Sequence, residues 1–558
     1  MERRVKLAQW QEWAKEGWSV VPYLVQYKGT SRGLPLSWRH AWKAASPYAF
    51  VLESGKGGRY TYLGLQPVSI LQGKGSSGEV IELSSGKRTN VTGEPLHLLE
   101  QWMGAWKAPR VPGWPDFRGG CAGFLSYDVV RSIEQLPTMA KDEPGFPDYL
   151  WMRMEEIWIY DHADDSMYCS VHVPLPWANK SAALDIQSEE PVSVSGDPSG
   201  TSDDSVLAPE QEKLLGQLYE TAAIRAESML SQWNEMFGTN SGIGVMSEDE
   251  HVRQARQAKA QELSGPNVEI WDRLQIDFSQ EAFQQAVLSI QEYIRQGDVF
   301  QVNLSLRRHL QLHADPADIY EWLRILNPSP YMGYLSSPGF SLASGSPELL
   351  VKLDGDVVSA RPIAGTRRRG SNPDEDAAME AELLGSEKER AEHIMLVDLE
   401  RNDIGRIAAY GSVHVPELMT VERYSHVMHL VSQVEGQIAE GNNAYDVIAA
   451  TFPGGTITGA PKIRTMEIIE ELEPVTRGPY TGSMGWIDYN GDMELNIIIR
   501  TLAVQDGIGY IQTGAGIVID SDPYREYREC HNKAKALIAA LMCSEEEAAA
   551  VAANIGGK

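Results

Sequence analysis

Hydrophobic and polar positions follow two different patterns along the 558-residue chain. Between residues 18 and 175, aromatic and β-branched residues gather in short runs such as WMRMEEIWIYDH, a composition that favours strands. In the second half, residues 283–297 predict a helix, whereas VFQVNLSLRRHLQL and GFSLASGSPELLVKL predict strands. The segment MELNIIIRTLAV predicts a single strand with Glu494 and Arg500 on the same face. Many strands with intervening helices indicate an α+β protein.

The middle of the chain is more polar. Residues 187–205 are rich in Ser, Asp, Gly and Pro, which predicts a mobile linker. Apolar residues at helical spacing, including Leu215 and Ile224, predict an amphipathic helix over 209–236. The stretch 238–265 is polar and is expected to be partly disordered. The pattern therefore divides the chain into an N-terminal region at 18–186, a linker or insertion at 187–275 and a C-terminal region at 278–545.

Two pairs of glutamates stand at helical spacing far apart in the chain. Glu389 and Glu392 form one pair, and Glu526 and Glu529 form the other. An i, i+3 spacing places both carboxylates on one helix face, where like charges repel each other. A solvated acidic face would explain them in a chain this acidic. The alternative is a site for a hard cation such as Mg²⁺, with carboxylates supplied by both helices.

The surroundings of the glutamate pairs favour the second explanation. The first pair precedes an apolar stripe that predicts a helix packed inward, formed by Ile394, Met395 and Val397. Further on, FPGGTITGAPK places a Gly/Thr-rich loop before a helix that begins near Pro461, an arrangement that can aim backbone N–H groups at an anion. The segment QTGAGIVIDS predicts a strand followed by a Gly-Ala-Gly turn, before a last helix that carries the second pair and Lys533.

Composition and charge exclude several classes of protein. The formal net charge of −28 argues against nucleic acid as a partner, because such binding needs a basic surface. No apolar run reaches the length of about 18 residues needed for a transmembrane helix, and the N-terminal sequence lacks the pattern of a signal peptide. Four scattered cysteines without CxxC spacing predict a reducing, cytoplasmic setting with neither a disulfide framework nor a zinc site.

Five motifs occur in a fixed order between about residues 279 and 542: PIAGTRRRG, EKERAEHIMLVDLERNDIGR, PGGTITGAPK, TGAGIVIDS and EYREC with KAKAL. Together they resemble the chorismate-utilising enzymes, which include the anthranilate, aminodeoxychorismate, isochorismate and salicylate synthases. A looser resemblance covers residues 49–162. The resemblance implies an α+β fold like that of anthranilate synthase component I, with two interleaved regions forming a β-sandwich of two large, mainly antiparallel sheets and helices outside. It places the chorismate-binding catalytic site in the region 278–545.

The resemblance also implies roles for individual residues. Glu392 and Glu529 would bind Mg²⁺ directly, and Glu389 and Glu526 would act through bound water. Glu348 in GSPELL occupies the family position of a general acid, which needs a raised pKa to donate a proton near neutrality. The remaining residues implied to bind substrate or carry protons are Thr366, Thr458 and Tyr480 around the ring, Arg500, Lys533, Gly514 and Gly516 at the enolpyruvyl carboxylate, and His429 as a pocket histidine.

Some of these residues have plainer explanations that the sequence leaves open. A histidine between apolar residues, as in SHVMHL, is often a satisfied core group. Lys533 could simply form an i, i+4 ion pair with Glu529 on the helix surface. A chain that keeps the fold as a metabolite sensor without catalysis is a further alternative. The presence of all four predicted metal-binding glutamates, together with Glu348 and Lys533, argues against it.

Two positions bear on which reaction the chain would catalyse. Gln301 stands where family members that add water carry a lysine base; ammonia needs no such base, so glutamine favours amination. Ala364 stands where many aminodeoxychorismate synthases carry a nucleophilic lysine, and alanine is the residue of anthranilate synthases. The motifs VNLSL, PGGTITGAPK, GSPELL and NIIIRT favour the aminodeoxychorismate branch. We therefore expect aminodeoxychorismate synthase component I, with anthranilate synthase component I as the alternative.

The resemblance finally implies partners and a second ligand. The chain has no glutaminase nucleophile motif of the GxCxGxQ type, so ammonia would come from a glutamine amidotransferase subunit or from solution. A tryptophan pocket of relatives is matched by two short segments, which contribute Glu53, Ser54, Pro330, Tyr331 and Met332. The expected ligands are thus chorismate, Mg²⁺ and a bound tryptophan.

Overall fold

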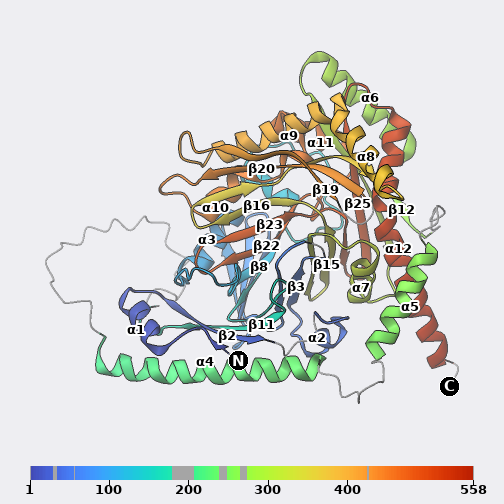
Figure 1. The fold of residues 1–558 in the computed structure, drawn as a ribbon. Helices are drawn as coiled ribbons and strands as arrows, with labels where there is room; N and C mark the ends of the chain where they lie inside the picture. Colours follow the sequence, from blue (N-terminus) through green and yellow to red (C-terminus); the bar gives the residue numbers. More distant parts are fainter. Residues whose placement is uncertain are drawn as a thin grey trace.

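A computed structural model describes residues 2–28, 34–55, 57–178, 207–237, 248–263, 273–423 and 427–556. Within these ranges the strands form two large antiparallel sheets that face each other, and helices cover their outer sides (Figure 1). The linker predicted at 187–205 lies outside the described residues. No helix in the described part of the chain is long and apolar enough to cross a membrane.

The first sheet contains thirteen strands. In spatial order they are β1 (Glu2–Arg3), β2 (Val20–Lys28), β11 (Ser166–Pro174), β10 (Glu156–Asp161), β4 (Tyr60–Gly64), β3 (Ala49–Glu53), β14 (Tyr331–Ser337), β15 (Phe340–Ser346), β24 (Thr501–Gln505), β25 (Ile508–Ile517), β13 (Gln301–Gln311) and β12 (Gln275–Ile276), with β21 (Gly459–Ala460) pairing beside β13.

The second sheet contains twelve strands. In spatial order they are β18 (Ile363–Arg368), β20 (Val427–Gln437), β17 (Val357–Ala360), β16 (Leu349–Asp354), β23 (Met493–Ile497), β22 (Ser483–Asp488), β8 (Gly120–Leu125), β9 (Tyr149–Met154), β5 (Ser69–Lys74), β6 (Ser77–Glu82) and β7 (Lys87–Thr92), with β19 (His414–Arg423) pairing with β20.

The N-terminal and C-terminal regions of the chain are interleaved in both sheets. In the first sheet, strands from the two regions meet where β3 pairs with β14, and Glu53 lies opposite Met332. In the second sheet they meet where β8 pairs with β22. Each region therefore completes the sheets of the other, and neither could bury its sheet edges alone.

The core between the sheets follows from the alternation of side chains along each strand. On β8, Ala122 and Phe124 point towards the first sheet, whereas Cys121 and Leu125 point to the outer side and pack under helices. The ring of Phe124 stacks on Phe340 of the first sheet, with 5.0 Å between ring centroids. Such contacts bury apolar surface between the sheets, which is the main stabilising contribution to a β-sandwich.

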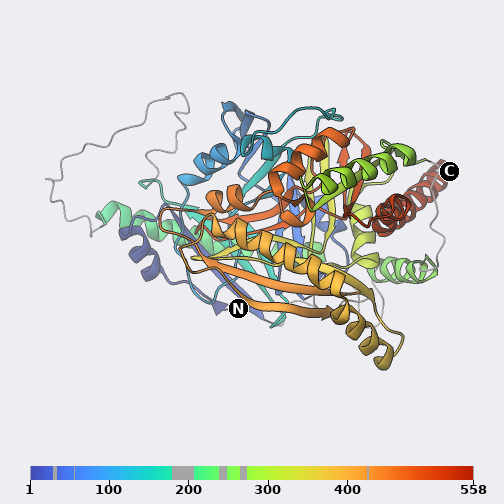
Figure 2. The same ribbon diagram turned by 90° about the horizontal axis from the view of Figure 1, so that it is seen from above.

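The helices lie outside the sheets. They are α1 (Leu7–Lys15), α2 (Arg39–Ala44), α3 (Pro95–Gly104), α4 (Pro209–Phe237), α5 (Glu248–Leu263), α6 (Gln280–Gln296), α7 (Pro316–Leu326), α8 (Pro373–Gly385), α9 (Glu387–Gly405), α10 (Ala444–Thr451), α11 (Lys462–Leu472) and α12 (Pro523–Gly556), with two 3₁₀ turns, η1 (Tyr127–Ser132) and η2 (Gly455–Ile457). The view from above shows α9 lying along strands of the second sheet (Figure 2).

Several predicted elements are present, with differences in detail. The helix expected over 283–297 is α6, which ends where Gly297 adopts the left-handed conformation with φ of +83°. The helix expected over 209–236 is α4, but Ile224 is 67% exposed because the buried face runs instead through Leu215, Tyr219 and Trp233. The stretch 238–265, expected to be partly disordered, includes the helix α5.

Two local predictions near the C-terminus are wrong. The strand expected along MELNIIIRTLAV is broken, because Arg500 has a φ of +50° between β23 and β24. The Gly-Ala-Gly sequence is not a turn but the last part of strand β25. Its glycines serve close packing: a Cβ at Gly514 would clash with the side chains of Asn303 and Tyr480.

Candidate active site

A cavity of about 800 Å³ lies in the C-terminal region, between the ends of β13 and β25, strand β18 and helices α9 and α12. It gathers most of the substrate-binding, catalytic and metal-binding residues predicted from sequence. Those that line it are Gln301, Glu348, Thr366, Glu389, Glu392, His429, Tyr480, Arg500, Gly514, Gly516, Glu526, Glu529 and Lys533. The fold thus brings residues more than 200 positions apart in the chain around one space.

Thr458 is the one predicted substrate-binding residue that does not line the cavity. Its side chain is buried, and the hydroxyl donates a hydrogen bond of 3.0 Å to the Gly454 carbonyl. Its neighbours Thr456 and Ile457, in η2, line the cavity instead. The tight 3₁₀ turn decides which residue of the TITG sequence points inward, and no periodicity in the sequence indicates it.

Glu348 follows strand β15 and is almost fully buried at the cavity wall. Its backbone carbonyl accepts a hydrogen bond of 3.0 Å from Ile497, which fixes the chain at this point. Burial raises the pKa of the Glu348 carboxyl to about 7, and Thr456, Arg500 and Lys533 oppose this shift only in part. A carboxyl with such a pKa is protonated in a large fraction of molecules near neutrality and can donate a proton.

Arg500 supplies a positive charge to the same cavity. Burial lowers the pKa of its guanidinium, and no carboxylate of the described residues lies within ion-pair distance of it. Its left-handed backbone conformation is costly for a residue with a side chain, and such conformations persist mainly where function requires them. The guanidinium is therefore available to a carboxylate from outside the protein, which its planar fork suits.

Two amide side chains on strand β13, Gln301 and Asn303, project from the strand beside the cavity. Both are buried, and their side-chain oxygens have no hydrogen-bond partner among the described residues. Asn303 was not predicted as a site residue from sequence. The glycines of β25 make room for both, since a Cβ at Gly516 would lie 2.6 Å from Gln301 Nε2. The cavity wall here is polar, and two of its hydrogen-bond acceptors have no partner in the described part of the protein, as is common where a ligand binds.

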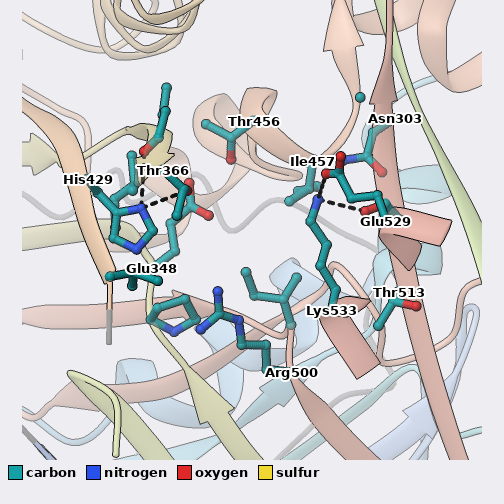
Figure 3. Close-up of a pocket in the computed structure, with 18 of the residues that line it drawn as sticks. Asn303, Glu348, Thr366, His429, Thr456, Ile457, Arg500, Thr513, Glu529 and Lys533 are labelled. Atoms are coloured by element: carbon teal, nitrogen blue, oxygen red, sulfur yellow. Dashed lines mark hydrogen bonds and ion pairs between the residues drawn. The ribbon is translucent and has the colours of Figure 1, made fainter. Parts of the chain in front are cut away.

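His429 lies on strand β20, opposite Thr366 of β18. Its Nδ1 is 3.1 Å from the Gly365 carbonyl, so Nδ1 carries the proton and Nε2 is the basic nitrogen. Burial lowers the pKa of the imidazole, which keeps it neutral near pH 7. Figure 3 shows Thr366 and His429 on one side of the cavity, and Glu529 and Lys533 on the other.

The predicted metal-binding glutamates come together from α9 and α12. Burial raises the pKa of Glu392, and the nearby charges of Glu389 and Glu529 raise it further. The pKa of Glu526 is raised by burial first and then by Glu529. Four carboxylates lining one cavity are oxygen donors that could hold a hard divalent cation, although no three acidic or metal-binding side chains in the described ranges already form a compact metal site.

The inner face of α9 differs from the apolar stripe predicted for it. Val397 of that stripe is buried, but Ile394 is 41% exposed, while His393, Glu400 and Asp403 are buried. Polar residues thus take part of the face that packs against the sheet. Hydrophobic periodicity does not indicate this, because the buried polar groups are held by partners on other elements: His393 Nε2 lies 2.6 Å from the Ser432 hydroxyl, and Asp403 is paired with Lys462.

A second cavity of about 630 Å³ lies between the N-terminal and C-terminal regions. It is lined by all five residues predicted for a tryptophan-like ligand, Glu53, Ser54, Pro330, Tyr331 and Met332. Glu53 is already held in a buried network, because its Oε1 accepts a 2.6 Å hydrogen bond from the Tyr320 hydroxyl and lies 2.7 Å from Arg324. Pro330, Pro347 and Ile363 line both cavities and so form the wall between them.

Comparisons with known proteins agree with this geometry. Residues 48–539 match the family model described as chorismate binding enzyme. Aminodeoxychorismate synthase component 1 of Bacillus subtilis (strain 168) is 42% identical over 89% of this chain and 92% of the relative. Anthranilate synthase component 1 of Thermus thermophilus is 41% identical over 90% and 93%. The crystal structure of anthranilate synthase component I from Streptococcus pneumoniae superposes with a TM-score of 0.65 at 30% identity, covering 87% of this chain and 93% of that one.

Proposed function

The chain belongs to the chorismate binding enzyme family, and from this premise we propose that it aminates chorismate with ammonia to 4-amino-4-deoxychorismate, the precursor of 4-aminobenzoate in folate synthesis. The observation that carries the proposal is that one cavity contains both a carboxyl that can donate a proton, Glu348, and a guanidinium without a carboxylate partner among the described residues, Arg500. An anionic substrate with a hydroxyl leaving group needs both.

The reaction forms a carbon–nitrogen bond and breaks the bond between the ring and its hydroxyl. Arg500 and Lys533 would hold the enolpyruvyl carboxylate, and Tyr480 and Thr366 would line the ring. Glu348 would give its proton to the departing hydroxyl, which leaves as water. The proton that the new ammonium group loses would then return to a base in the cavity, either the Glu348 carboxylate or the basic nitrogen of His429.

A divalent cation is part of the proposal. Glu392 and Glu529 would bind Mg²⁺ directly, with Glu389 and Glu526 outside them. When bound, the ion would neutralise the ring carboxylate and fix its orientation. It would also counter, within the cavity, the negative charge of the chain, which otherwise opposes the approach of a dianion.

Ammonia as the nucleophile is supported by Gln301. An amide cannot take a proton from water, whereas ammonia carries a free lone pair and needs only to be positioned. The unpartnered side-chain oxygens of Gln301 and Asn303 offer hydrogen-bond acceptors for its N–H groups. This supports amination over the addition of water.

Anthranilate synthase component I is the second candidate function. Ala364 lines the cavity with a methyl group, so no lysine at this position can add covalently to the ring. In either branch ammonia itself would therefore attack. Attack that leads to nitrogen at C2, with loss of pyruvate, gives anthranilate. Relatives with the two activities are nearly equally identical to this chain, at 42% and 41%.

Ammonia would be supplied by a glutamine amidotransferase subunit. The relatives are named component 1, which implies a second component, and this chain has no glutaminase nucleophile motif. We further propose that the second cavity binds tryptophan, either as a structural ligand or as an inhibitor. The five residues expected for such a ligand all line it.

The product of the purified chain distinguishes the two branches. Chorismate, MgCl₂ and an ammonium salt at alkaline pH would be incubated with the chain and analysed by mass spectrometry. We expect an aminated ring that keeps its enolpyruvyl group and gives 4-aminobenzoate only after a separate lyase is added. Anthranilate together with pyruvate, without the lyase, would assign the chain to the tryptophan branch instead.

A further inference from the structure

One of the four predicted metal-binding carboxylates is already paired with a cation of the protein. Arg367, on strand β18, places Nη1 3.0 Å from Oε1 of Glu389. The same Nη1 donates a 2.9 Å hydrogen bond to the Thr366 carbonyl, and Nε lies 2.9 Å from Oε1 of Glu382 on α8. Arg367 thus holds Glu389 against β18, and it also ties α8 to the same strand.

The position of Glu389 differs from that of Glu392, one turn further along α9. The Glu389 carboxylate lies against the backbone of Gly365, where a Cβ would be 3.0 Å from Oε2. Glu392 forms no ion pair within the described ranges, and its pKa is raised by burial and by its acidic neighbours. One member of this pair is therefore neutralised by the protein, and the other is not.

The pair on α12 repeats this asymmetry. Lys533 Nζ lies 2.8 Å from Oε1 of Glu529 and donates a hydrogen bond of 2.9 Å to the Gly514 carbonyl (Figure 3). Glu526 has no ion pair among the residues that the structure describes. Because Lys533 has a second partner at Gly514, it can leave Glu529 and stay anchored. Arg367 has the equivalent second partners at Glu382 and at the Thr366 carbonyl.

We propose that Arg367 is an internal counter-ion that occupies Glu389 when no divalent cation is bound, and that cation binding displaces it from this carboxylate. The inference rests on the proposed Mg²⁺ site. The proposal gives a role to Arg367, which the spacing of the glutamates does not indicate. It also predicts that this neighbour of a metal ligand weakens metal binding, whereas such neighbours usually support it. A basic residue that only oriented Glu389 would support metal binding, whereas a counter-ion competes with it.

The size of the effect follows from the exposure of the ion pair. The side chains of Arg367 and Glu389 are 23% and 22% exposed, so the pair is partly solvated. Ion pairs of this kind change an equilibrium only modestly, and their loss corresponds to a change in metal affinity of about two- to fivefold. On displacement Arg367 keeps its contact with Glu382, so α8 stays attached to β18 while the Glu389 side chain is released.

The test measures metal binding directly, without substrate and without turnover. Mg²⁺ would be titrated calorimetrically into the full chain and into Arg367→Gln, and we expect the variant to bind about two- to fivefold more tightly. Glu382→Gln should have the opposite effect, since Arg367 then loses a competing partner and holds Glu389 more strongly. Arg368→Gln and Arg369→Gln are matched controls, because these neighbouring arginines pair with Glu375 and Asp376. Both should bind Mg²⁺ like the wild type.

Unchanged or weaker Mg²⁺ binding by Arg367→Gln, with the variant folded by circular dichroism, would overturn the proposal and make Arg367 a supporting residue of the site. If Arg367→Gln does not fold, Glu382→Gln provides an independent test. Mg²⁺ binding by Glu382→Gln that is unchanged or tighter than that of the wild type would also overturn the proposal. Failure of the metal site itself is distinguishable. In that case the wild type gives no heat with Mg²⁺, or Glu392→Gln and Glu529→Gln bind as the wild type does, and the counter-ion proposal falls with it.

Discussion

The hydroxyl of Thr366 lies 3.0 Å from Nδ1 of His429, across the pairing of strands β18 and β20. The same Nδ1 is 3.1 Å from the Gly365 carbonyl, so the strand backbone selects the tautomer and the threonine hydroxyl reinforces its orientation. A neutral imidazole oriented in this way can accept a proton at its other nitrogen.

If His429 carries protons in the reaction, its loss should reduce turnover and leave substrate binding nearly intact. We expect His429→Ala to lower kcat by about 10²-fold, the lower range for a proton-transfer residue, with a small change in KM. Thr366→Val serves as the comparison: it removes the hydroxyl, whereas the Gly365 carbonyl still fixes the tautomer, so kcat should fall much less. Equal effects of the two substitutions would indicate that His429 only packs against the cavity wall.

Glu348 should make activity depend on pH. Because its pKa is about 7, the protonated form needed for donation is lost as the pH rises through 7. Turnover corrected for the concentration of unprotonated ammonia should therefore fall above pH 7. Glu348→Gln cannot donate a proton and should lower turnover by about 10²- to 10⁴-fold, without a descending limb. A pH profile with the same descending limb in both proteins would assign it to another group.

The same shift predicts how stability depends on pH. The folded-state pKa of Glu348 is raised from 4.5 to about 7, so the native state binds more protons than the unfolded state between these values. Stability from this group is fully present below pH 4.5 and is lost as the pH rises through 7. The free energy of unfolding of Glu348→Gln minus that of the wild type should therefore increase by up to about 3 kcal/mol from pH 5 to pH 8. Urea denaturation at both pH values measures this, and a constant difference would contradict it.

The predicted metal ligands can be tested on turnover and folding together. Glu392→Gln and Glu529→Gln should abolish Mg²⁺-dependent activity while both variants stay folded. Glu392→Gln should keep or raise the melting temperature, because it removes repulsion from Glu389 and Glu529. Glu529→Gln should change it little, because the ion pair with Lys533 that it loses is largely exposed. Glu387→Gln is the matched control, since this glutamate is exposed in the first turn of α9 and does not line the cavity. Full activity of either ligand variant would refute the metal assignment.

Gln301 should decide which nucleophile reacts. We expect Gln301→Lys to lower the yield of aminated product and to add a hydroxylated isomer of chorismate, because an amine at this position can deprotonate water. Gln301→Met, of similar size, should lose amination without forming this isomer. Liquid chromatography followed by mass spectrometry separates these outcomes, because the isomer has the mass of chorismate and differs only in retention. A lysine variant that makes no such isomer would remove Gln301 from the choice of nucleophile.

The second cavity makes a separate prediction about tryptophan. Protein stripped of ligand by unfolding and refolding should bind tryptophan with a stoichiometry near one in a calorimetric titration. Ser54→Phe should abolish this heat, because the added ring would fill part of the cavity that Ser54 lines. Activity with ammonium in the absence of tryptophan provides the control for correct refolding. No heat from the wild type would count against an intact tryptophan site.

The sequence by itself determined those features that depend on local pattern and on long motifs. The spacing of Glu389 with Glu392 and of Glu526 with Glu529 predicted which helix faces carry charge, and both helices are present. Most residues that the family resemblance assigned to substrate and metal line one cavity. A match over several long motifs places each side chain at a known position of the shared fold, and so predicts this grouping. The pairing of strands from distant parts of the chain was implied by that resemblance, and hydrophobic periodicity did not predict it.

Tertiary structure alone decided the features that arise where elements meet. Thr456 faces the cavity instead of Thr458 because η2 turns tightly, and on α9 Ile394 is exposed while Glu400 and Asp403 are buried. The break at Arg500 depends on a backbone conformation that residue type disfavours and that the surrounding strands impose. The pairing of Arg367 with Glu389 joins a strand to a helix that begins some twenty residues later. Hydrophobic periodicity reports which face of an element is buried, but it does not say which charged groups two elements bring together, because that depends on how they pack.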